Sequence, residues 1–164
     1  MIVYTLGTII FPFDRAISWL QILLEEEIIV EPVLLQHGST SAAKLSHPLL
    51  TSVASLTSNE MYEAVKQASF VISHAGQGST RMLTEMGACF VLLPRLKRYK
   101  EHVDDHQLLF ARAVEKYGVL HCTELDQLIY HTRYRPSRFR GELFNAPSLA
   151  DHLITRYSSL QLQP

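Results

Sequence analysis

The chain has 164 residues, of which 47% are hydrophobic and 19% charged, and its formal net charge is −1. This composition fits one compact domain and excludes global disorder, which requires low hydrophobicity and high net charge. The 15 basic and 16 acidic side chains lack the basic surplus typical of proteins that bind mainly nucleic acid. The two cysteines, Cys89 and Cys122, cannot form a disulfide framework or a four-ligand zinc site, which favours a reducing compartment.

No apolar stretch approaches the roughly 20 residues that a membrane-spanning helix needs. The first apolar run meets Gly7 too early for a secretory signal, which requires a charged region and then a long apolar one. We therefore expect a cytoplasmic protein that folds from its first residue.

The first predicted element is a buried strand at 2–6, which ends at Gly7-Thr8. A helix follows from residue 13, because apolar residues recur at i, i+4, i+7 and i+11: Phe13, Ile17, Leu20 and Leu24. A second strand is predicted at 32–36. Residues 39–57 are expected to be irregular, apart from a strand near 49–56.

A capping box at Thr57 and Glu60 predicts the start of the next helix. Behind it, a strand is predicted at 70–73, a tight loop at 74–78, a helix at 79–86 and an apolar strand at 89–93. The remaining chain is predicted to contain a helix over 103–117, a late strand at 119–121 and short helices at 124–130 and 148–157.

Continuously apolar strands that alternate with helices are typical of a parallel sheet covered on both faces. The sequence therefore predicts a doubly wound, Rossmann-like α/β fold. We expect a single domain over residues 1–164, without an internal repeat or a linker.

Ligands bind such sheets at the C-terminal ends of the strands. Three predicted loops reach that edge: Gly7-Thr8, residues 74–80 and residues 94–107. In the second loop, Gly76 and Gly78 would let the backbone approach an anion, and the following helix N-terminus would stabilise its charge. Ser79 and Thr80 would add hydroxyl donors. The alternative is a tight turn without a ligand, and the loop is not a Walker motif because it lacks Gly-Lys-Ser/Thr.

The third loop combines cations, carboxylates, two histidines and an amide within residues 95–107. Such a set can bind both a phosphate and the hydroxyls of a sugar. The alternative is a solvated loop in which Asp104 or Asp105 caps a helix. A less favoured alternative is a metal site, and with it a metal-dependent hydrolase, formed by His102, Asp105 and His106.

A basic cluster near the C-terminus contains two aromatic residues, Tyr134 and Phe139. A solvated surface loop is the first interpretation, attraction to anionic lipid or an acidic partner is the second, and nucleic acid, which the net charge disfavours, is the third. The basic residues are Arg133, Arg135, Arg138 and Arg140.

The three loops, in this order, resemble the C-terminal domain of glycosyltransferase family 28, the donor-binding half of a GT-B fold. The matching segments are Leu6-Gly7-Thr8 with Pro12-Phe13-Asp14-Arg15, Ser73 to Ser79, and Pro94-Arg95 with Glu101 to Gln107. The likeness covers about residues 1–120, which leaves 121–164 as a C-terminal helical region. It is greatest to the single-domain small subunits of bacterial exopolysaccharide glycosyltransferases and of the dolichol-linked N-acetylglucosaminyltransferase.

The resemblance implies a UDP-sugar-binding catalytic subunit of a two-component inverting glycosyltransferase that acts on a lipid-linked acceptor. A separate membrane-anchored subunit would supply the acceptor site, and the isolated chain could also form a homo-oligomer. No metal or other cofactor is implied. The resemblance places His74, Asp105 and Gln107 in the catalytic group. It implies that the donor is bound by Gly7, Thr8, His74, Gly76, Gly78, Ser79, Glu85, Arg95, Glu101, His102, Asp105, His106 and Gln107.

The sequence departs from the family pattern at one position of particular interest. Eight residues after the loop histidine, the family usually has a glutamate that binds the ribose, and this chain has Met82. Glu85 is nearly one helical turn further on. Two further departures are Ala88-Cys89 in place of Lys-Pro and Lys100 in place of glycine. A non-catalytic subunit that binds nucleotide weakly is therefore the alternative function.

Overall fold

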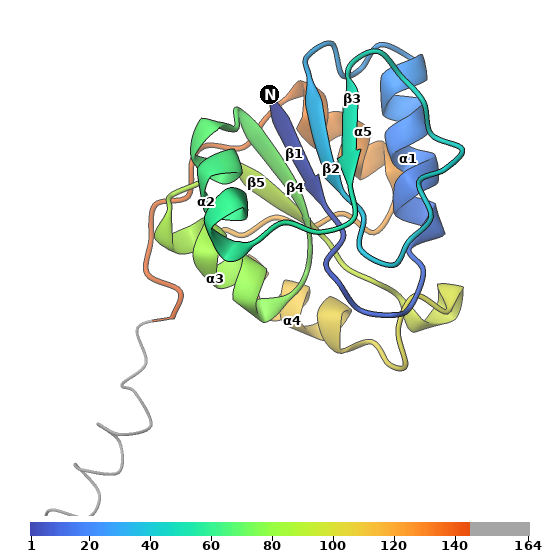
Figure 1. Cartoon of the computed structure of the whole chain (residues 1–164). Coiled ribbons are helices and arrows are strands. Elements are labelled where there is room, and N and C mark those ends of the chain that lie inside the picture. Colours follow the sequence, from blue (N-terminus) through green and yellow to red (C-terminus); the bar gives the residue numbers. More distant parts are fainter. Residues whose placement is uncertain (145–164) are drawn as a thin grey trace, which may run out of the picture.

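The computed structural model describes residues 1–144, which form a five-stranded parallel sheet in the order β3-β2-β1-β4-β5 (Figure 1). The strands are β1 (Ile2–Thr5), β2 (Val33–Gln36), β3 (Leu50–Val53), β4 (Phe70–His74) and β5 (Phe90–Leu93). The helices are α1 (Asp14–Glu25), α2 (Ser58–Gln67), α3 (Gln77–Glu85), α4 (His106–Glu115) and α5 (Leu125–Arg133), with the 3₁₀ turn η1 (Lys97–Tyr99). The predicted doubly wound α/β fold is confirmed. The helix predicted at 148–157 lies outside the described residues.

Successive residues of the central strands pack against opposite layers of helices, which explains why these strands are apolar at every position. In β1, Ile2 and Tyr4 join the apolar cluster of α1 and α5, whereas Val3 joins the cluster of α2, α3 and α4. The Tyr4 hydroxyl is buried as well, and it donates a hydrogen bond of 2.9 Å to the Ala16 carbonyl. Both faces of the sheet are therefore core.

The predicted capping box at the start of α2 is confirmed. The Thr57 side chain accepts a hydrogen bond from the Glu60 N–H (3.2 Å), and the Glu60 carboxylate accepts one from the Thr57 N–H (2.7 Å). This reciprocal pair satisfies two of the N–H groups that a helix start leaves free.

Two predictions about the second half of the chain are corrected. Residues 119–121 are not a strand, because within the described chain His121 makes only an isolated bridge to Leu92 of β5. The helix predicted over 103–117 begins at His106, since residues 101–105 form a series of bends. These bends bring the Asp104 carboxylate to 3.2 Å from His102 and 2.5 Å from His106, whereas a helix would turn it away from both.

The C-terminal ends of β1, β4 and β5 are neighbours in the sheet, so the three predicted loops meet at one edge. Cys89 and Cys122 are both buried, free thiols. Among the helices of residues 1–144, none is long and apolar enough to cross a bilayer.

Candidate functional site

A pocket of about 590 Å³ opens at the C-terminal edge of the sheet, between the loops that follow β1 and β4 and the start of α2. Its wall combines small and polar residues from the strand ends with apolar side chains from α2 and α3. The lining residues are Thr5, Gly7, Thr8, Ile9, Gln36, Leu56, Thr57, Ser58, Met61, Tyr62, His74, Gly78, Ser79 and Met82. The structure thus brings Gly7, Thr8, His74, Gly78 and Ser79 together, as the sequence predicts.

His74 occupies a narrow slot between two glycines of this site. A Cβ atom at Gly7 would lie 2.7 Å from the His74 Nε2, and one at Gly76 would lie closer still. Gly7 also has a φ of +74°, a backbone conformation that other residues adopt only with strain. Both glycines are therefore needed for the imidazole to sit against the backbone of the two loops.

The environment of His74 keeps its imidazole neutral. Burial, assisted by the nearby Arg95 guanidinium, lowers the pKa of His74 from 6.5 to about 4. In a neutral imidazole one nitrogen donates a hydrogen bond and the other accepts one, and the group is a weak base at this pKa. His74 is therefore suited to orienting a ligand or the loop rather than to deprotonating an acceptor.

The N-terminus of α3 faces the pocket through its first turn. Gly78 and Ser79 line the pocket, and Met82 follows one turn later. Within residues 1–144, no side chain caps this helix at Gly76, which leaves its first N–H groups to other partners. The Thr80 hydroxyl, predicted as a donor to a bound anion, donates in this structure to the Gly76 carbonyl (2.9 Å). Free N–H groups and the helix dipole together form a site for an anion.

Gln36, at the end of β2, is a pocket residue that the sequence analysis missed. Its Oε1 accepts hydrogen bonds from the Thr5 hydroxyl (2.6 Å) and the Gly7 N–H (3.2 Å). Its Nε2 donates to the carbonyls of Gly7 (3.0 Å) and Ala54 (3.1 Å). The amide therefore fixes the Gly7 turn to the segment after β3. The sequence signal for this role of Gln36 was its position as the polar last residue of an otherwise apolar strand.

Arg95, which follows β5, is fully buried and holds the loop after β1 in place. Its guanidinium donates to the carbonyls of Leu6 (2.8 Å) and Phe11 (2.6 Å), and to that of Glu101 (3.2 Å). The buried Glu101 carboxylate accepts hydrogen bonds from the Leu96 N–H and from Arg15. Both predicted donor-binding residues are thus engaged inside the protein, where they position the loops.

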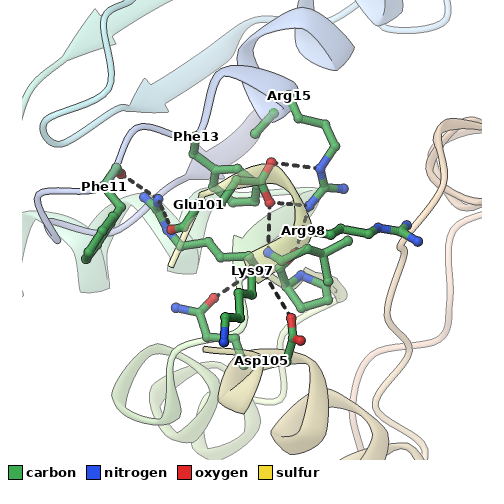
Figure 2. A network of polar contacts seen from close by, with 12 residues as sticks. Phe11, Phe13, Arg15, Lys97, Arg98, Glu101 and Asp105 are labelled. Atoms are coloured by element: carbon green, nitrogen blue, oxygen red, sulfur yellow. Dashed lines mark hydrogen bonds and ion pairs between the residues drawn. The ribbon is translucent and has the colours of Figure 1, made fainter. Parts of the chain in front are cut away.

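Asp105 and Gln107 stabilise the loop between β5 and α4. The Asp105 carboxylate accepts a hydrogen bond from the Lys97 N–H (2.9 Å; Figure 2), and the Gln107 Oε1 accepts one from the Arg95 N–H (3.2 Å). Neither residue lines the pocket. The contact of these two side chains with a donor sugar stays a prediction.

The two histidines of this loop do not meet Asp105. His102 and His106 both approach Asp104, with Nδ1 to Oδ1 distances of 3.2 Å and 2.5 Å. The predicted group of His102, Asp105 and His106 is therefore wrong in its carboxylate. The reason is the bent backbone at 101–105, which turns Asp105 toward Lys97.

Glu85 does not reach the pocket. Its carboxylate is exposed and pairs with Arg81 on the surface of α3, at 2.8 Å. The position at the pocket wall is held by Met82, and among the described residues no carboxylate lines this pocket. The structure therefore does not place Glu85 where it could replace the family's glutamate.

A parallel sheet with a glycine-lined, uncapped helix N-terminus at its C-terminal edge is an arrangement that many nucleotide-binding domains share. Comparison with known proteins assigns it more narrowly. The chain belongs to the family of the glycosyltransferase family 28 C-terminal domain, whose model matches residues 1–133.

Two solved glycosyltransferase structures are similar to this fold. One is SnogD from Streptomyces nogalater, with a TM-score of 0.53 and 16% identity over 81% of this chain and 38% of that chain. The other is the glycotransferase of kitacinnamycin, with a TM-score of 0.57 and 13% identity over 97% of this chain and 38% of that one. The chain therefore spans well under half the length of either enzyme. No curated protein matches the sequence.

Proposed function

We propose that this chain is the UDP-sugar-binding subunit of a two-component inverting glycosyltransferase, acting on a lipid-linked acceptor in exopolysaccharide or glycolipid biosynthesis. The observation that carries the proposal is the pocket in which Gly7, His74 and the free N-terminus of α3 converge. The family supports a glycosyltransferase role.

In the proposed reaction, negative charge develops on the leaving diphosphate as the sugar C1–O bond breaks. The N–H groups at the start of α3, with Gly78 and Ser79 at the pocket wall, would stabilise that charge, and this requires no metal. Neutral His74 would orient the diphosphate. Asp105 and Gln107 would bind the hydroxyls of the donor sugar.

The acceptor hydroxyl needs a general base, and we assign that base to the partner subunit. His74, with a pKa of about 4, is poorly matched to the task near neutral pH. The isolated chain should therefore show little transferase activity. A membrane-anchored partner would hold it at the cytoplasmic face of the membrane.

An exposed aromatic pair at the C-terminal end of α5, formed by Tyr130 and the cap residue Tyr134, supports the presence of a partner. The rings of Tyr130 and Tyr134 lie 5.1 Å apart and are 58% and 66% exposed. Of the basic cluster, Arg135 is engaged with Glu31, which ties this segment to the body of the domain. Exposed tyrosines are enriched in protein interfaces, so we place partner binding at α5.

Met82 favours the second candidate function, a non-catalytic subunit with weak nucleotide affinity. An apolar side chain at the pocket wall cannot accept a hydrogen bond from the ribose hydroxyls as a carboxylate would. The two candidates differ in one measurable quantity, the affinity of the isolated chain for UDP.

Calorimetric titration with UDP, without and then with Mg²⁺, separates the two candidates. We expect metal-independent binding with a Kd on the order of micromolar. A Cβ at Gly78 meets open space, so Gly78→Asp should fold normally and repel the diphosphate, whereas the similarly sized Gly78→Asn should bind far better. Absence of binding at about millimolar UDP would favour the non-catalytic subunit.

A further inference from the structure

Three side chains of the bends before α4 converge on one point. His102, Asp104 and His106 each offer a ligand atom, and these atoms all lie within 4.8 Å of one another. The two imidazole rings meet edge to face with their centroids 4.3 Å apart. The His102 ring also contacts the Phe11 ring, with a distance of 5.8 Å between the two ring centroids. This contact connects the His102, Asp104 and His106 group to the loop after β1.

The contacts within the group leave His102 with an unresolved conflict. Its Nδ1 lies 3.2 Å from the Asp104 Oδ1, which requires a proton on Nδ1, and also faces the Asp104 N–H at 3.4 Å, which requires a lone pair. Either tautomer satisfies only one of the two contacts. A cation between the imidazoles and the carboxylate would bind the Nδ1 lone pair and the Asp104 oxygen together, so that no proton would be needed between these two atoms.

We propose that His102, Asp104 and His106 bind a first-row divalent cation, with zinc as the best fit to two imidazole nitrogens and one carboxylate oxygen. Three protein ligands leave a coordination position for water. Bound metal would fix the 101–106 segment, which carries Asp105. These three residues do not line the pocket, and this metal-site proposal does not depend on the proposed function.

The two cysteines of the chain are poorly placed to compete for zinc. Cys89 and Cys122 are both buried, and burial raises the pKa of the Cys122 thiol to about 12, so it does not offer a thiolate. Asp104 and His106 are more than half exposed, which leaves the site open to a metal from solution. Their exposure also means that substituting them should not disturb the fold.

The test is a calorimetric titration of the untagged, chelator-treated full chain with ZnCl₂, followed by the visible spectrum with Co²⁺. We expect saturable binding of one equivalent and the intense d–d bands of a low-coordinate cobalt site. Asp104→Asn and His106→Ala should each weaken zinc binding at least about tenfold, because loss of even an outer-sphere partner costs that much.

Two control variants make the test specific. His131→Ala removes a histidine outside the group, and Asp105→Asn removes the neighbouring carboxylate that faces Lys97. Both should bind zinc like the unmodified chain. Absence of saturable binding, or binding that survives Asp104→Asn and His106→Ala, would overturn the proposal. UDP binding measured in excess EDTA tests the proposed function separately.

Discussion

Arg15 and Glu101, 86 positions apart in the sequence, form a two-point ion pair in which Nε donates to Oε1 (2.9 Å) and Nη2 to Oε2 (2.8 Å). Their side chains are only 10% and 3% exposed. Arg15 also donates to the Pro94 carbonyl (2.9 Å) and packs over the ring of Trp19. The pair therefore joins the first turn of α1 to the loop that follows β5.

Removing one member of this pair should be strongly destabilising. Glu101→Ala leaves the buried Arg15 charge and the Leu96 N–H without their partner, and we expect a loss of about 3–5 kcal/mol in the free energy of unfolding. Urea unfolding followed by circular dichroism measures it. The matched control is Glu85→Gln at the exposed Arg81 pair, which should cost less than about 1 kcal/mol. Equal losses at both pairs would contradict the assignment.

His74 should make the protein less stable in mild acid. Its pKa is 6.5 in an exposed setting and about 4 in the fold, so between these values the unfolded chain takes up a proton that the folded chain does not. Stability therefore falls as pH decreases through this interval, by up to about 1.4 kcal/mol per pH unit. Urea unfolding across the interval should show a shallower slope in His74→Asn. His131, whose pKa burial also lowers, is present in both proteins and cancels.

The glycines around His74 should respond unequally to alanine. Gly7→Ala and Gly76→Ala place a methyl group against the imidazole, and Gly7 adds the strain of a positive φ, so we expect losses of about 1–3 kcal/mol and impaired UDP binding. Gly78→Ala meets open space in a helix, where alanine is favoured by about 0.5–1 kcal/mol. Thermal unfolding of the three variants measures the change in stability, and calorimetric titration with UDP measures the change in binding. A destabilised Gly78→Ala would refute this account of the loop.

The sheet and the loops at its edge could be predicted from the sequence because their signals are local. Runs such as 89–93 are apolar at every position since both sheet faces are buried, and the Thr57–Glu60 capping box needs only four residues. The predictions that were wrong depend on contacts between distant segments or on the geometry of loops. The late strand at 119–121 depends on what the edge of β5 pairs with, which local sequence does not encode.

In the candidate site, too, the residues with a local sequence signal could be predicted, and those that depend on strand order or loop geometry could not. Gly7, His74 and Gly78 could be placed because glycines after buried strands indicate a ligand edge. The role of Gln36, which bonds to Gly7 and Ala54, depends on strand order. The choice of Asp104 over Asp105 as the partner of His102 and His106 depends on the bends at 101–105, because each backbone rotation redirects a side chain. The sequence alone does not distinguish two adjacent aspartates in a loop as partners of a histidine, whereas the structure does.

Met82→Glu should strengthen nucleotide binding. Met82 lines the pocket wall, one turn after Gly78, and its replacement would supply a carboxylate to a pocket that has none among the described residues. A carboxylate can accept hydrogen bonds from both ribose hydroxyls, and hydrogen bonds to charged groups contribute about 1.5–3 kcal/mol. We therefore expect the Kd for UDP to fall by about tenfold or more.

The specificity of that gain can be tested with a second ligand and a second position. Binding of inorganic pyrophosphate, which lacks a ribose, should not improve in Met82→Glu, because the new carboxylate repels it. Glu85→Gln should leave UDP affinity unchanged, since Glu85 pairs with Arg81 outside the pocket. If Glu85→Gln weakens UDP binding while Met82→Glu does not strengthen it, the ribose lies along the other side of α3 and the assignment of the pocket wall is wrong.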